Sequence, residues 1–105
     1  MLWVNLIMNI DKIKSDLKKF AQERDWEQFH SPKNLAMALS GEVGELSEIF
    51  QWLTEDQSNK ENIRHEDLAK VREEVADILP YIICLSDKFG IDLEQTLFDR
   101  LKVLN

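Results

Sequence analysis

Two pairs of carboxylates at helical spacing are the residues of this sequence best suited to chemistry. One pair is Glu42 and Glu45, and the other is Glu74 and Asp77. Residues three apart on an α-helix lie about 60° apart around its axis, so each pair projects from one face of its helix. If the two helices pack antiparallel, the four carboxylates converge.

Converging carboxylates need a counter-charge. They repel one another and are costly to remove from water, so they persist near a core only if a cation neutralises them or their pKa values rise. All four donors are oxygens, and the Glu-x-x-His motif of di-iron bundles is missing, which favours Mg²⁺ over iron or zinc, with Mn²⁺ as the second choice. The plainer interpretation is that these acids lie on solvated helix faces.

The rest of the sequence predicts an all-α fold to position these acids. Among 105 residues there are three Gly and two Pro, too few turn-formers for a many-stranded β protein. Apolar spacing, Ser31-Pro32 as a helix start, Gly90 as a helix end and Asp92 as a cap set the bounds. The expected helices cover about residues 9–24, 32–53, 66–89 and 93–104, with a polar loop over 54–65.

The two central helices each carry an apolar stripe in steps of three and four residues. The stripe of the second helix comprises Leu35, Leu39, Glu42, Leu46, Ile49 and Leu53. The stripe of the third comprises Leu68, Val71, Val75, Ile78, Ile82, Leu85 and Phe89. Glu42 occupies a seam position, which a solvated face does not explain. Each stripe faces a core or a partner helix.

A second stripe flanks the apolar one on the third helix: Lys70, Glu74, Asp77, Tyr81, Cys84 and Lys88. It places the acid pair, a phenol and two ammonium groups along one groove. Lys70 and Lys88 are therefore candidate phosphate contacts, although ordinary surface lysines explain them equally well. Pro80 predicts a bend in this helix, which either aims the ligands or has no role.

Aromatic side chains near the helix ends are candidates for binding a flat base. Trp26, Phe29 and Trp52 offer rings for stacking, and His30 offers hydrogen bonds to base or sugar edges. The plainer interpretation is that the rings plug the core and that His30 caps the second helix.

Charge and composition exclude several classes of function. Thirteen basic against 20 acidic residues give a net charge of −7, which argues against a general nucleic-acid binder. Residues 1–8 are an apolar extension, too short to span a bilayer, and residues 9–105 form a single helical domain. Cys84 is the one cysteine, which fits a reducing compartment such as the cytoplasm. A monomer of this size buries only about 60–70% of its unfolded surface, which favours a partner chain.

Taken together, these motifs closely resemble the dCTP pyrophosphatase branch of the MazG-like NTP pyrophosphohydrolases. The resemblance covers about residues 10–100, nearly the whole chain. Glu-x-x-Glu alone is a weak signal, whereas the motifs WEQFH, GEVGEL and Glu-x-x-Asp in this order and spacing are a strong one. The matching runs are residues 20–30, 32–35, 41–46, 48–52 and 73–77, together with Tyr81.

This resemblance implies an all-α NTP pyrophosphatase fold, four-helix bundle-like and assembled as a dimer or dimer of dimers. The implied activity converts a (deoxy)nucleoside triphosphate, dCTP or a related dNTP, to monophosphate and pyrophosphate in nucleotide-pool house-cleaning. The implied Mg²⁺ ligands, which are also the catalytic residues, are Glu42, Glu45, Glu74 and Asp77. The implied nucleotide pocket comprises Trp26, Glu27, Gln28, Phe29, His30, Trp52 and Tyr81.

The sequence departs from the family pattern in two places. Family members continue with a basic tail that contributes to phosphate binding, whereas this sequence stops at Asn105, and Pro80 replaces an aliphatic residue. The expected chemistry is in-line attack of water, with Glu45 as the favoured base because Glu42 lies deeper in the stripe. The competing interpretation is a non-catalytic helical module for dimerisation or partner binding.

Overall fold

The structure, a computed structural model, describes residues 8–104, and all regular secondary structure in that range is helical. The elements in chain order are α1 (Ile10–Glu23), the 3₁₀ turn η2 (Glu27–Phe29), α2 (Pro32–Phe50), α3 (Glu55–Ser58), α4 (His65–Lys88) and α5 (Leu93–Leu104). The predicted all-α class is confirmed, and the four long helices agree closely with the expected ones. The predicted N-terminal extension lies outside the described residues except for Met8.

Helix ends form where the sequence signals place them. The Ser31 hydroxyl accepts a hydrogen bond from the Asn34 N–H at 3.1 Å and caps α2. The Asp92 carboxylate accepts one from the Gln95 N–H at 3.0 Å at the start of α5. Gly90 follows α4 with φ +63°, a conformation that side chains rarely adopt. These local signals explain why the bounds were predictable.

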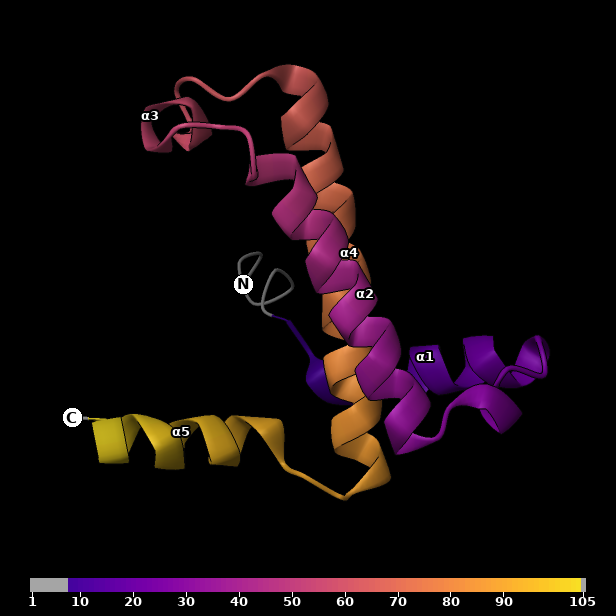
Figure 1. Cartoon of the computed structure of the whole chain (residues 1–105). Helices are drawn as coiled ribbons and strands as arrows, with labels where there is room; N and C mark the ends of the chain where they lie inside the picture. Colours follow the sequence, from indigo (N-terminus) through magenta and orange to yellow (C-terminus); the bar gives the residue numbers. More distant parts are fainter. Residues whose placement is uncertain (1–7, 105) are drawn as a thin grey trace, which may run out of the picture.

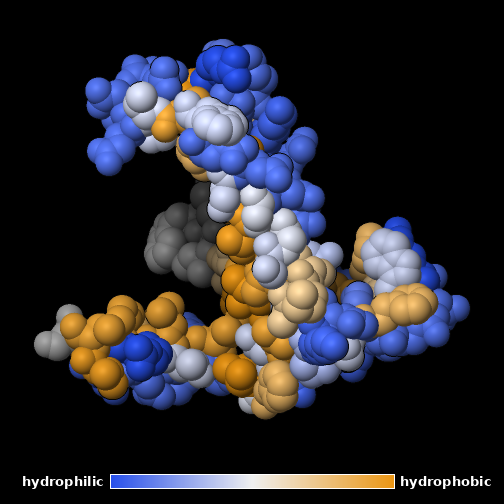
Figure 2. All heavy atoms as spheres, viewed as in Figure 1, coloured by the Kyte–Doolittle hydropathy of each residue, from blue (hydrophilic) through white to orange (hydrophobic). Residues whose placement is uncertain are grey.

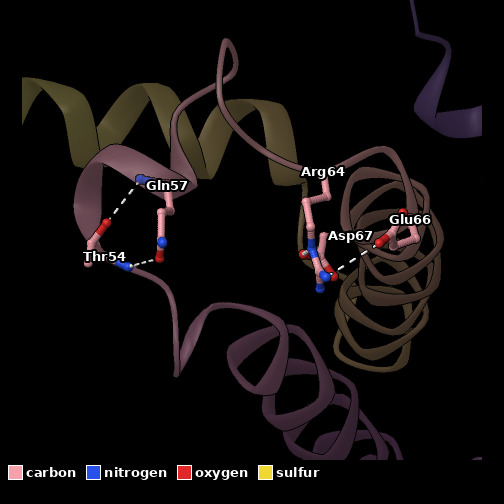
Figure 3. A network of polar contacts seen from close by, with 5 residues as sticks. All are labelled: Thr54, Gln57, Arg64, Glu66 and Asp67. Carbon is pink, nitrogen blue, oxygen red and sulfur yellow. Dashed lines mark hydrogen bonds and ion pairs between the residues drawn. The ribbon is translucent and has the colours of Figure 1, made fainter.

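The prediction of a plain loop over residues 54–65 was wrong, because this segment contains the short helix α3 (Figure 1). Figure 3 shows the capping box that starts it. The Thr54 hydroxyl accepts a hydrogen bond from the Gln57 N–H at 3.1 Å, and the Gln57 side chain accepts one from the Thr54 N–H at 2.9 Å. A single turn has no apolar periodicity, so only its cap could have revealed it.

The same view shows how the chain enters α4. Arg64, the residue before the helix, donates to Asp67 at 3.0 Å and pairs with Glu66 at 3.4 Å (Figure 3). Asp67 is buried, so the guanidinium supplies the partner that a buried carboxylate requires. These contacts fix the first turn of α4, the helix that carries Glu74.

The antiparallel pair of α2 and α4 forms the centre of the fold, and α1 packs against α4 (Figure 1). Leu35 of α2, Ile83 of α4 and Ala21 of α1 are buried and form the core where the three helices meet. Pro80 lies inside α4, which continues through it to Lys88. The two acid-bearing helices are therefore held side by side, as the proposed convergence of carboxylates requires.

The fourth long helix, α5, projects away from the other helices, and none of its residues is buried (Figure 1). The stripe on α2 is at least half-buried along its whole length. On α4, by contrast, only Val71, Ile78 and Leu85 of the predicted stripe are half-buried. The remaining stripe members are exposed in the single chain: Leu68, Val75, Ile82 and Phe89.

Candidate metal centre

Three carboxylates from the two central helices converge on one point. Glu42 and Glu45 project from α2 and Glu74 from α4, and one oxygen of each lies within 4.8 Å of the other two. The spacing of three residues puts the α2 pair on one face, and the antiparallel packing brings Glu74 opposite. The structure thus brings together three of the four acids that the sequence singled out.

Two of these carboxylates have an oxygen without a hydrogen-bond partner. Oε2 of Glu42 and Oε2 of Glu74 are buried, and no donor among the described residues reaches them. A buried acceptor without a partner costs free energy, and an anionic one costs more. A divalent cation with oxygen ligands would satisfy both atoms and neutralise the cluster, so these residues fit Mg²⁺ or Mn²⁺.

The electrostatics of the cluster act mainly on Glu74. Its pKa is raised to about 7, first because a proton on Glu74 is stabilised by hydrogen bonding to Glu42. Partial burial of the charged form raises the pKa further, as do hydrogen bonding to Glu45 and repulsion from both neighbours. In the absence of a cation, Glu74 therefore holds a proton between about pH 4.5 and pH 7, where an ordinary surface glutamate has lost it.

Asp77, the fourth predicted ligand, lies outside this group. It follows Glu74 by three residues on α4, and its side chain is exposed. Its place as a ligand depends on its side-chain conformation, which helical spacing does not determine. The role of Asp77 stays a prediction.

The predicted nucleotide pocket is divided between two ends of one helix. Residues 26–30 lie just before α2, and Trp52 lies just after it. The 19 residues of α2 span roughly 28 Å, with Glu42 near the middle. Trp26 packs edge-on against Phe20 at 5.5 Å, whereas Trp52 is 86% exposed. A single chain therefore does not bring these aromatic residues together.

Some predicted substrate-binding residues do share a cavity. A hollow of about 540 Å³ between α1, η2 and α4 is lined by Glu27, Gln28, His30, Cys84 and Lys88, among others. The other predicted residues are elsewhere: Lys70 is exposed on α4, and Tyr81 is half-buried on the same helix and does not line the hollow. Partial burial raises the pKa of the Cys84 thiol, so it is not an activated nucleophile.

Lys14 and Lys18 also line this hollow, and neither was predicted from the sequence. Lys14 lies 3.6 Å from Asp87 of α4, and this ion pair joins the two helices. The two lysines are four residues apart, before and after Leu17, so they lie on one face of α1. This spacing is the sequence signal that could have identified them.

Comparison with known proteins decides the family. The sequence profile of the MazG-like family matches residues 37–104, about two-thirds of the chain. The chain belongs to the MazG-like family. Two of its relatives are both named dCTP pyrophosphatase 1: the human protein is 41% identical over 85 residues, and the bovine protein is 43% identical over 83 residues. These matches cover 81% and 79% of this chain but 50% and 49% of the relatives.

A solved structure extends the comparison to the fold. A pyrophosphatase from Archaeoglobus fulgidus has a TM-score of 0.80 and 32% sequence identity, covering 91% of this chain and 88% of that one. The family match over residues 37–104 includes all four predicted acids and excludes Trp26 to His30. This MazG-like chain spans about half the length of the curated relatives it matches. No helix within residues 8–104 is long and apolar enough to cross a bilayer.

Proposed function

We propose that this protein is a Mg²⁺-dependent nucleoside triphosphate pyrophosphohydrolase that acts on dCTP or a related dNTP. The observation that carries the proposal is the cluster of Glu42, Glu45 and Glu74, with its two unpartnered buried oxygens. This cluster lies in a MazG-like chain whose relatives include proteins named dCTP pyrophosphatase 1. The products are the monophosphate and pyrophosphate, and the role is clearance of unwanted nucleotides. Mn²⁺ is the alternative cofactor.

The proposed roles of the acidic residues follow from their burial and charge. Bound Mg²⁺ supplies positive charge for the triphosphate oxygens and lowers the pKa of water. Glu42, Glu45 and Glu74 are the proposed ligands of the ion, with Asp77 as the fourth, and Glu42 and Glu74 are the half-buried pair that anchors it. Glu45 is exposed, so it is the carboxylate placed to accept a proton from the attacking water. A Glu45→Gln variant that keeps the wild-type acidic limb of the pH–rate profile would exclude this role.

We expect charged side chains to bind the phosphates. The sequence has no Gly-rich phosphate loop, so the metal ion and basic side chains take the place of backbone N–H groups as phosphate ligands. Lys88 and Lys70 are the proposed phosphate contacts on α4.

We also place the enzyme in the cytoplasm, because its one cysteine, Cys84, is a free thiol.

The nucleotide pocket proposed from Trp26 to His30, Trp52 and Tyr81 requires more than one chain. Its two aromatic parts lie at opposite ends of α2, so they meet only if chains assemble. We therefore include a homodimer or homotetramer in the proposal, with the nucleotide as the small-molecule partner. Nucleic-acid polymers and membranes are not partners in this proposal.

Replacing Trp52 by Ala is expected to raise KM for dCTP about tenfold and to leave the melting temperature unchanged. Base stacking on an aromatic ring contributes about 1–3 kcal/mol, whereas an exposed ring adds little to stability. Steady-state kinetics and thermal melting measure the two effects. Met37→Ala, at an exposed apolar residue within α2, is the control. An unchanged KM would remove Trp52 from the pocket.

Thermal shift separates this proposal from the alternative of a non-catalytic interaction module. Millimolar Mg²⁺ is expected to raise the melting temperature by several degrees, and a non-hydrolysable dCTP analogue is expected to raise it further. Each ligand binds the folded state only and stabilises it by mass action. If neither ligand shifts the midpoint, the carboxylates do not bind a metal ion and the interaction module is the better account.

A further inference from the structure

Pro80 stands in the interior of α4, although proline is the residue least suited to that place. It has no N–H, so the carbonyl of Ala76 receives no hydrogen bond from it, and its ring crowds that carbonyl. The helix nevertheless continues from His65 to Lys88. Positions where a sequence works against its own local structure are expected to be functional ones, so Pro80 is a candidate for a role at the carboxylate cluster.

The position of Pro80 around α4 gives the direction of its effect. Crowding opens a helix on the proline side, so the helix bends away from the proline. Val71 precedes Pro80 by nine residues, which places it about 180° away around the axis, and Ile78 and Leu85 lie within about 40° of that direction. These three are the half-buried members of the α4 stripe, on the side that packs on α2, so α4 bends toward α2.

Pro80 also separates two halves of α4 that are held differently. On its C-terminal side, Ile83 is fully buried in the core with Leu35. Among residues 65–79, on its N-terminal side, the one buried residue is Asp67, a carboxylate. Hydrophilic residues cover the α3 end of the α2–α4 pair, and hydrophobic residues gather toward its other end (Figure 2). The acid-bearing half therefore depends on the direction in which α4 leaves the core.

We propose that Pro80 is a positioning residue, whose bend holds the acid-bearing half of α4 against α2. Glu74 lies about 60° from the centre of the inner face of the bend, so movement of α4 toward α2 carries it toward Glu42 and Glu45. It precedes Pro80 by six residues, roughly 9 Å, so a change of about 20° in the bend moves it by roughly 3 Å. One oxygen of each acid lies within 4.8 Å of the other two, and a displacement of that size would separate them.

Pro80 has no group that binds a metal ion, so it acts on the site through Glu74 alone. The consequence for metal binding rests on the proposed function, whereas the consequence for packing does not. Removing the proline is expected to give a more stable protein with a looser site. A bend without a role predicts the same gain in stability and no change at the carboxylates.

The test compares the full chain with its Pro80→Ala and Pro80→Ile variants, the second of which supplies an aliphatic residue of similar bulk. Both variants regain the backbone N–H that α4 lacks at this position. The melting temperature of the metal-free protein is therefore expected to rise by at least about 5 °C in both. Circular dichroism during heating measures it.

Methyl NOEs of the metal-free protein measure the packing on either side of Pro80. Leu46 follows Glu42 by four residues and Val71 precedes Glu74 by three, so the two apolar residues face each other across the antiparallel pair. The NOE between them is expected to weaken at least about twofold in both variants as α4 straightens. NOEs within the core, on the C-terminal side of Pro80, are expected to stay unchanged.

Mn²⁺ affinity gives the readout at the site itself. Calorimetric titration is expected to show about tenfold weaker binding in both Pro80 variants, because a ligand has lost its support. Leu79→Ala is the control, since it removes half-buried packing from the adjacent residue and leaves the helix hydrogen bonds unchanged. It is expected to lower the melting temperature while the NOE and the affinity stay within about twofold of wild type.

Two results would overturn the proposal. A higher melting temperature with an unchanged NOE would show that Pro80 is a bend without a role, and a melting temperature that does not rise would show that it does not disturb α4. If the wild-type chain binds no Mn²⁺, the metal centre of the proposed function fails, and the NOE comparison alone decides the role of Pro80.

Discussion

Replacing Glu74 by Gln is expected to lower kcat/KM for dCTP hydrolysis by about 100-fold or more, with the helical fold intact. The amide has nearly the same shape but no charge, so it removes a ligand and keeps the packing between α2 and α4. It also removes one member of a cluster whose charges repel one another. Initial rates at saturating Mg²⁺ and circular dichroism measure activity and fold.

The adjacent residue provides the matched control. Glu73 is exposed on the same turn of α4 and lies outside the cluster, so Glu73→Gln makes the same charge change beside the site. This control is expected to keep activity within about twofold of wild type. Wild-type activity in Glu74→Gln would contradict the assignment of the cluster as the catalytic centre.

The affinity for Mn²⁺ is expected to fall about tenfold between pH 8 and pH 6. Glu74 has its pKa raised to about 7 by Glu42, partial burial and Glu45, and the ion must displace its proton. Calorimetric titration at the two pH values measures the affinity, and repetition in buffers of different ionisation enthalpy counts the protons released. Equal affinity at both pH values would show that Glu74 is not a ligand.

The raised pKa of Glu74 also predicts how the stability of the metal-free protein changes with pH. The folded state holds a proton on Glu74 up to about pH 7, whereas an ordinary glutamate loses it near 4.5. The stability contributed by this proton is therefore complete below pH 4.5 and is lost as pH rises through 7. Metal-free protein is expected to melt at a lower temperature at pH 8 than at pH 6 from this cause, and Glu74→Gln should reduce the difference.

Sequence spacing alone predicted the carboxylate cluster because helix geometry is regular. Glu42 and Glu45 had to share a face of α2, and Glu42 stood in an apolar stripe that had to meet another helix. The opposing Glu74 followed from antiparallel packing. Spacing could not determine which of the four acids meet within one chain, and Asp77 lies outside the group of three.

The rest of the site depends on how the helices pack in three dimensions, which the spacing of residues along the sequence does not determine. Spacing says which residues share a helix face, but not that residues 26–30 and Trp52 lie at opposite ends of α2. The stripe on α4 was visible, yet its division between α2 and an exposed row depends on how three helices cross. The short helix α3 is set by one capping box, and the projection of α5 by the turn at Gly90.

Product analysis tests the central claim most directly. The full chain is incubated with dCTP, with and without Mg²⁺, and the monophosphate, diphosphate, pyrophosphate and phosphate are resolved by ³¹P NMR. We predict that dCMP and pyrophosphate appear in equal amounts, that the reaction requires the metal, and that Glu74→Gln abolishes it while Glu73→Gln does not. Release of phosphate with dCDP, or turnover unaffected by metal removal, would contradict the account.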